Sequence, residues 1–154
     1  MNAVTAAEHL AEYLAIQELV NEFARRVDHD AAVDNELLFT ADAYFEYDGR
    51  SNCGRADIRA AYDMRRARGE RTARHVFSNL TVYRDTDDLL RGRSIMLLFG
   101  ADGPAPIGFA SPIVVADVED VYERVDSAWL FARRVITPIF VEADRPAVLP
   151  LGSR

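Results

Sequence analysis

Apolar residues recur at every third or fourth position near the N-terminus, at Ile16, Leu19, Val20, Phe23, Ala24 and Val27. This spacing is typical of one face of an amphipathic helix, and Thr5 and Glu8 ahead of it have the spacing of a capping box. We expect the helix to end near Asp28. Asp30 then stands where it can cap a short second helix that runs through Leu38.

The middle of the chain predicts a strand and then another helix. Residues 43–47 are rich in aromatic side chains and end at Asp48-Gly49, a pattern that indicates a strand closed by a tight turn. Residues 55–68 return to helical spacing. Gly69 stands where the C-terminal cap of that helix is expected.

Four longer segments with the pattern of strands follow, at residues 72–83, 89–99, 113–124 and 129–140. Acidic turns at 85–88 and 126–127 and a loop rich in proline and glycine at 100–112 connect them. Helices first and antiparallel strands afterwards indicate an α+β fold, with the helices on one face of a meander. We expect one domain over residues 1–154, with a peripheral tail at 142–154.

Composition narrows the class of protein. A chain of 154 residues, 49% of them hydrophobic, is the size of one globular domain. Its net charge of −7 opposes binding to nucleic acid or to an anionic membrane. We also find no apolar run long enough to span a bilayer and no signal-peptide pattern in residues 1–10, so we expect a cytoplasmic protein.

The chain lacks the residues that several kinds of chemistry require. A single cysteine, Cys53, with only His9, His29 and His75, cannot build the usual zinc clusters, so we expect no metal. All 18 basic residues are arginine, which excludes a lysine Schiff base and the lysine of a phosphate-binding loop. We expect no cofactor.

Two residues remain as candidates for proton transfer. Asp28 lies at the end of the first helix, on the edge of its buried stripe, where it is either a base or a solvated helix-end carboxylate. His75 lies in a strand on the same face as Phe77 and Asn79, where it either pairs with a carboxylate or is a core histidine bonded to the backbone. Composition does not decide between these alternatives.

Four stretches, between about residue 15 and residue 140, carry a resemblance to a known family. They are Ala15-Ile-Gln-Glu-Leu19 leading to Asp28, Leu38-Phe-Thr-Ala-Asp-Ala43, Arg74-His-Val-Phe-Ser-Asn-Leu80, and Tyr122-Glu-Arg124 before Trp129. In order and spacing they resemble the SnoaL-like branch of the nuclear transport factor 2-like superfamily. That branch includes polyketide cyclases, scytalone dehydratase and lindane dehydrochlorinase.

The resemblance implies a cone-shaped, curved antiparallel sheet whose N-terminal helices enclose a deep, mostly apolar pocket. It implies that Asp28 and His75 form a base dyad, and that Arg134 contributes as the arginine five residues beyond Trp129. Strand alternation puts Arg134 and Phe131 on opposite faces, so an inward Arg134 needs a bulge. Because Phe23 occupies the position of a dehydrochlorinase lysine, we do not expect halide elimination.

From these residues we expect a cofactor-independent lyase or isomerase, of the dehydratase or cyclase type, acting on an apolar ring-bearing molecule. Tyr47, Asn79 or Arg134 can stabilise an enolate oxygen. The candidate wall residues are Phe23, Phe39, Tyr47, Phe99 and Phe140.

The alternative is a non-catalytic binding or assembly subunit, because the chain also resembles the small subunit of ring-hydroxylating dioxygenases. Apart from a small-molecule substrate, we expect the partner to be a second copy of the chain, in a homodimer or homotrimer. Such domains expose the convex side of their sheet, which a copy can cover.

Overall fold

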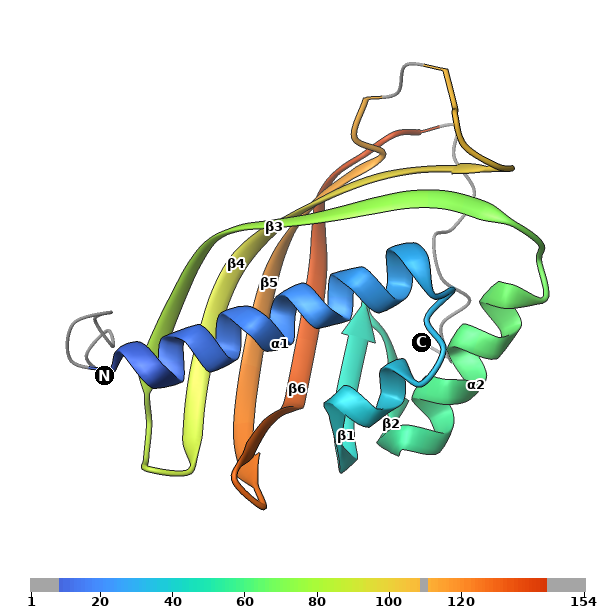
Figure 1. Ribbon diagram of the computed structural model, residues 1–154. Helices are drawn as coiled ribbons and strands as arrows, with labels where there is room; N and C mark the ends of the chain where they lie inside the picture. Colours follow the sequence, from blue (N-terminus) through green and yellow to red (C-terminus); the bar gives the residue numbers. More distant parts are fainter. Residues whose placement is uncertain (1–8, 109–110, 144–154) are drawn as a thin grey trace.

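Six strands form one curved, mixed sheet in a computed structural model that describes residues 9–108 and 111–143 (Figure 1). The sheet order is β2-β1-β6-β5-β4-β3. The strands are β1 (Phe39–Tyr47), β2 (Arg50–Cys53), β3 (Arg71–Arg84), β4 (Leu89–Asp102), β5 (Val114–Val125) and β6 (Ala128–Val141). Neighbouring strands are antiparallel except for β1 and β6, which are parallel. The α+β class and the antiparallel pairing of the four long strands are confirmed.

Helix α1 (Leu10–His29) lies across the hollow side of the sheet, while α2 (Gly54–Arg66) and the 3-10 helix η1 (Asn35–Leu38) lie beside β1 and β2 (Figure 1). The stripe read from the sequence faces the sheet, since Ile16, Leu19, Val20 and Phe23 are all buried. The proposed cap at Thr5 and Glu8 lies outside the described residues. Within the described residues, no helix combines the length and apolar character needed to cross a membrane.

The segment between α1 and β1 differs from the prediction. The second helix is only the single turn of η1, and Asp30 does not cap it, because its carboxylate pairs with Arg25 at 2.7 Å. After α1 the backbone turns through left-handed conformations at Ala31 and Ala32, with φ of 52° and 59°. This turn ends α1 and shortens the next helix. Strand β2 was not predicted, because its four residues carry no apolar alternation.

Bulges bend the long strands. In β3 the pairing with β4 shifts between Ser78 and Thr81, and Asn79 within the shift has a φ of 56°. In β6 the pairing with β5 shifts at two places. Each bulge adds a residue to one strand and increases its bend and twist, so the sheet curves around α1.

An aromatic cluster joins α1 to the sheet. Phe23 is 2% exposed and meets the rings of Phe39, Phe45, Phe77 and Phe131 edge to face, at centroid distances of 5.9–6.4 Å. Such pairs add about 0.5–1.5 kcal/mol each beyond the burial of area. Phe23 is buried as predicted, and this cluster fixes the position of the C-terminal half of α1 over the sheet.

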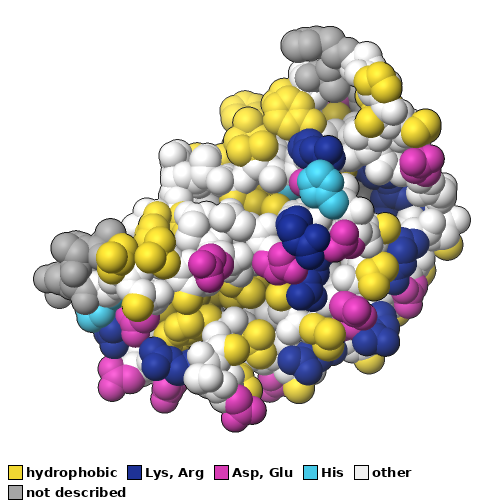
Figure 2. All heavy atoms as spheres, viewed as in Figure 1, with side chains coloured by type: hydrophobic (Ala, Val, Ile, Leu, Met, Phe, Trp, Pro, Cys, Tyr) yellow, Lys and Arg dark blue, Asp and Glu magenta, His cyan; other side chains and the backbone are white. Residues whose placement is uncertain are grey.

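Charged side chains of both signs are mixed on the face that Figure 2 shows. On α1, Glu22 pairs with Arg25 and with Arg26 at 2.7 Å. The arginine hydrogen bonds lower the pKa of Glu22 to about 2. Exposed pairs of this kind contribute little to stability.

Candidate active site

Asp28 and His75 are in contact. Asp28 lies one residue before the end of α1, and its Oδ1 is 2.6 Å from Nδ1 of His75 in β3. Its Oδ2 accepts the backbone N–H of His75 at 2.8 Å. Both side chains are largely buried, at 6% and 10% exposure. The hydrogen bond that we predicted between these residues is present.

The contact fixes the state of the imidazole. An ionised carboxylate only accepts hydrogen bonds, so a neutral His75 carries its proton on Nδ1 toward Asp28. The lone pair is then on Nε2. Because Asp28 also holds the backbone of His75, the ring has one fixed orientation, as a general base requires.

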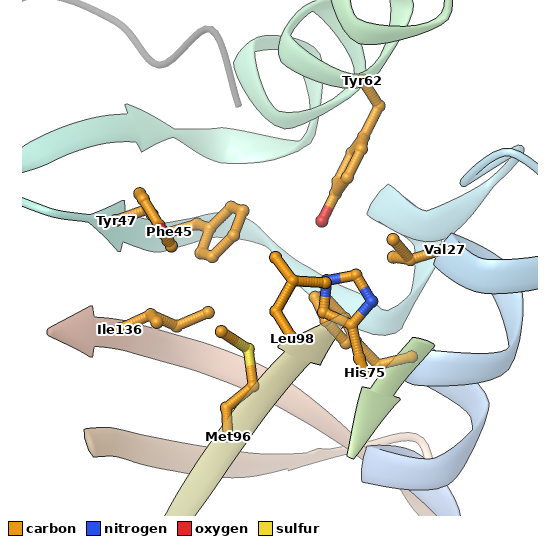
Figure 3. A pocket seen from close by; sticks show the side chains of 9 residues that line it. Val27, Phe45, Tyr47, Tyr62, His75, Met96, Leu98 and Ile136 are labelled. Atoms are coloured by element: carbon orange, nitrogen blue, oxygen red, sulfur yellow. The ribbon is translucent and has the colours of Figure 1, made fainter. Parts of the chain in front are cut away.

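His75 lines a cavity between α1, α2 and the sheet (Figure 3). The other lining residues are Phe23, Val27, Phe45, Tyr47, Tyr62, Met96, Leu98 and Ile136. Asp28 is not among them and lies behind His75. The cavity wall is therefore mostly apolar, with one imidazole and two phenols as its polar groups.

The cavity is small. Its volume is about 20 Å³, which is enough for one water molecule, whereas pockets for drug-sized ligands span roughly 300–1,000 Å³. The cavity thus lies where we expected a pocket, but it is much smaller than the deep pocket that we expected.

Arg134 points inward because β6 contains a bulge. Tyr122 of β5 pairs with Phe131, and the next pair joins Val121 to Arg133, so Ala132 is an extra residue. Phe131 and Arg134 are both completely buried. The bulge brings onto one face two residues that strict alternation would put on opposite faces.

Arg134 nevertheless does not line the cavity. Its guanidinium lies 4.3 Å from the ring centroid of Phe23 and 4.0 Å from that of Phe131. Phe23 is itself part of the cavity wall. The arginine is therefore next to the cavity but covered by aromatic rings.

Asp120 holds the buried arginine. Nε and Nη2 of Arg134 donate to the two carboxylate oxygens at 2.9 Å, and the Tyr122 hydroxyl donates to Oδ2 at 2.9 Å. Burial opposes the charge of Arg134, but Asp120 raises the pKa of the guanidinium overall. Gly92 makes room for this group, because a Cβ there would lie 2.7 Å from the Tyr122 ring.

Four of the predicted contact residues lie elsewhere. Phe39 is buried in the core behind Phe23, at a centroid distance of 6.2 Å, and does not line the cavity. Asn79 is exposed because the bulge in β3 interrupts the alternation that would have placed it beside His75. Phe99 follows the inward Leu98 and so faces outward, and Phe140 is 68% exposed near the end of β6. The structure therefore does not bring these four residues to the cavity.

Tyr62 is a cavity residue that the sequence did not reveal. It comes from α2, is 3% exposed and stacks on Phe45 with an interplanar angle of 17°. Its hydroxyl points into the cavity on the side where His75 lies (Figure 3). The helical spacing of residues 55–68 predicts the helix, but nothing in that spacing separates a core tyrosine from one at a pocket.

The part of the chain that the structure describes contains no group of three or more His, Cys, Asp or Glu side chains placed to hold a metal ion. The polar groups that the cavity offers to a ligand are His75, Tyr47 and Tyr62.

Solved structures share this fold. A protein from Novosphingobium aromaticivorans, provisionally named as a scytalone dehydratase, is 18% identical, with a TM-score of 0.75 over 93% of this chain and 100% of that one. ActVI-ORFA from Streptomyces coelicolor is 20% identical, with a TM-score of 0.74 over 86% and 98%. Rv3472 from Mycobacterium tuberculosis, described as of unknown function, is 25% identical, with a TM-score of 0.74 over 94% and 82%.

The fold is shared with a second protein from Novosphingobium aromaticivorans, described as an NTF2-like protein with a cystatin-like fold, which is 22% identical with a TM-score of 0.70 over 87% of this chain and 86% of that one. Residues 8–135 match the model of the SnoaL-like domain, and the chain belongs to this family. The resemblance seen in the sequence is confirmed. A comparison with curated proteins gave no match.

Proposed function

We propose that the protein is a cofactor-independent lyase or isomerase, of the dehydratase or cyclase type, acting on an uncharged ring-bearing molecule. The observation that carries the proposal is the contact of Asp28 with His75, whose ring lines an apolar cavity. The aromatic wall, with Phe23, Phe45 and Tyr62, suits a flat ring.

In the proposed reaction, Nε2 of His75 removes a proton from a carbon next to a carbonyl group. The electrons of the C–H bond enter the new enolate, and Asp28 stabilises the imidazolium that forms. When a hydroxyl group stands on the next carbon, its C–O bond breaks as the enolate collapses, and the imidazolium gives the hydroxyl its proton. The products are water and an unsaturated ketone, with His75 restored.

A ring enters only when the lining side chains move apart, because the cavity volume is about 20 Å³. Met96 and Leu98 are unbranched at Cβ and can change rotamer, and Tyr62 moves with α2. Such opening is consistent with conformational steps that admit substrate in many enzymes.

The outer face of the sheet supports a homodimer or homotrimer. The strand register places Val76, Leu97, Val115 and Phe140 side by side across β3, β4, β5 and β6. Val76 is 46% exposed and Phe140 is 68% exposed. We name this row the apolar band. It is a surface that a second copy would cover.

The small cavity favours a second candidate, a non-catalytic binding or assembly subunit. In that case Asp28 and His75 are a structural pair that ties α1 to β3, and the protein turns nothing over.

Proton exchange separates the two candidates. The probes are bicyclic ketones, beginning with 2-tetralone, and NMR measures the exchange of the protons beside the carbonyl with D₂O. The wild type should accelerate exchange for at least one ketone. His75→Ala should abolish the acceleration, and Asp28→Asn should reduce it by about a hundredfold or more, because the imidazole loses its orientation and its counter-charge.

His29→Ala is the matched control, since it makes the same change beside Asp28 at an exposed position. It should keep the wild-type rate. If the wild type exchanges no ketone of the panel, or if the His75 variant keeps the rate, the proton-transfer function is refuted and the binding subunit takes its place.

A further inference from the structure

The cavity presents two hydroxyl groups besides the imidazole, on Tyr47 from β1 and on Tyr62 from α2. Either can donate a hydrogen bond to a carbonyl oxygen of a ligand. Proton removal beside a carbonyl turns this oxygen into an enolate, which carries negative charge. The donor that suits the reaction is therefore the one in the more positive surroundings.

The surroundings of Tyr47 disfavour negative charge. Burial and the neighbouring carboxylate of Asp48 raise the pKa of Tyr47 to about 12, and Arg71 offsets this only in part. An enolate oxygen next to Tyr47 would thus meet the field of Asp48. The same field that keeps the phenol protonated would repel the developing charge.

Burial raises the pKa of Tyr62 further than that of Tyr47, but the charged neighbour of Tyr62 is of the opposite sign. Burial raises the pKa of Tyr62, whereas the charge of Arg134 and the amide of Asn35 lower it. Both groups favour negative charge at the phenol oxygen, so both strengthen the hydrogen bond that the hydroxyl donates. Because burial prevails, the phenol stays protonated and remains a donor.

Asn35 is a buried polar residue next to Tyr62. It is completely buried in η1, and no described residue lies in good hydrogen-bond geometry with its amide nitrogen or oxygen, although the amide lies close enough to Tyr62 to lower the pKa of the phenol. Nη1 of Arg134 is likewise buried without a partner among them. Buried polar groups of this kind are normally paired. Neither residue lines the cavity, but both act on the Tyr62 hydroxyl, which does, so the polar and positive groups behind the cavity wall are on the side of Tyr62.

We propose that the Tyr62 hydroxyl binds the carbonyl oxygen of the substrate and stabilises the enolate, and that Asn35 is a positioning residue that acts through Tyr62. Arg134 then works from behind the cavity wall, as a fixed positive charge held by Asp120, without touching the substrate. The substrate lies with its carbonyl group toward α2 and its acidic C–H toward His75. This inference rests on the proposed function.

The test uses the ketone that the wild type exchanges fastest. Tyr62→Phe should lower the maximal exchange rate by about a hundredfold, as expected when one oxyanion donor is lost, and change KM little. The infrared carbonyl band of the bound ketone should shift to lower frequency in the wild type and return toward its free position in the variant. Tyr47→Phe should cost less than Tyr62→Phe.

Asn35→Ala tests the positioning role. Apart from its weak contact with the Tyr62 phenol, the amide has no partner in hydrogen-bond geometry among the described residues, so its removal strands no other group and the fold should persist. The variant should lower the exchange rate several-fold in the wild type and have no further effect in Tyr62→Phe. Tyr83→Phe, a matched change on the outer face, should leave the rate unchanged.

The outcomes distinguish a failure of the role of Tyr62 from a failure of the proposed function. Exchange that depends on His75 but survives Tyr62→Phe, or that falls further with Tyr47→Phe, overturns the role of Tyr62 and leaves the proposed function standing. An additive effect of Asn35→Ala in the Tyr62→Phe background overturns the positioning role. If no exchange depends on His75, the proposed function fails and this inference fails with it.

Discussion

The buried ion pair of Asp120 and Arg134 permits a quantitative prediction about stability. The side chains are 1% and 0% exposed, and two hydrogen bonds of 2.9 Å join them. Asp120→Ala leaves the guanidinium enclosed by aromatic rings with no counter-charge. Stranding a buried charge costs about 3–5 kcal/mol, and the lost acceptor of the Tyr122 hydroxyl adds about 1 kcal/mol.

This loss is a large part of the roughly 5–15 kcal/mol that stabilises a typical domain. The double variant Asp120→Ala with Arg134→Met removes both charges, and an apolar side chain then fills the space between the rings. It should therefore be more stable than the Asp120 variant alone, since a buried ion pair gives little net stability over an apolar replacement. Urea unfolding measures both, with equal slopes required for comparison.

Glu119→Ala is the control. Glu119 neighbours Asp120 but faces outward, where it pairs with Arg93 at 3.3 Å with both side chains mostly exposed. Removing that pair should cost less than about 1 kcal/mol. If Asp120→Ala costs no more than the control, or if the losses of Asp120→Ala and Arg134→Met simply add in the double variant, the two charges are not coupled and the reasoning is refuted.

Two further outcomes are expected. Because burial raises the pKa of Tyr47 to about 12 and those of Tyr62 and Tyr122 as well, the folded state keeps phenol protons that the unfolded chain loses. The free energy of unfolding should then be unaffected below pH about 10 and fall as pH rises above it, by up to about 1.4 kcal/mol per pH unit per tyrosine. Urea unfolding should show a shallower fall for Tyr62→Phe, and an unchanged slope would contradict the assignment. Light scattering at micromolar concentration should give a dimer or trimer, and Val76→Glu in the apolar band should shift it toward monomer; a monomeric wild type would count against the interface.

Local sequence patterns predict most of the elements and much of the core, but not β2 or the shortened helix η1. The helical stripe around Phe23 and the four long strands with their turns follow from local periodicity, which is a property of the backbone and of side-chain polarity. Asp28 and His75 could be paired from sequence only through the family resemblance, since 47 residues separate them along the chain. Each residue alone fitted an ordinary structural role equally well.

Packing between the elements fixes which residues meet at the cavity. Bulges interrupt the alternation of side chains between the two faces of a strand, so Arg134 points inward and Asn79 points outward. Tyr62 entered the cavity because α2 packs beside β1, a contact between elements that no local pattern encodes. The electrostatic difference between Tyr47 and Tyr62 likewise arises from charges that the fold brings close. Periodicity gives the face on which a side chain lies, but only packing fixes its neighbours.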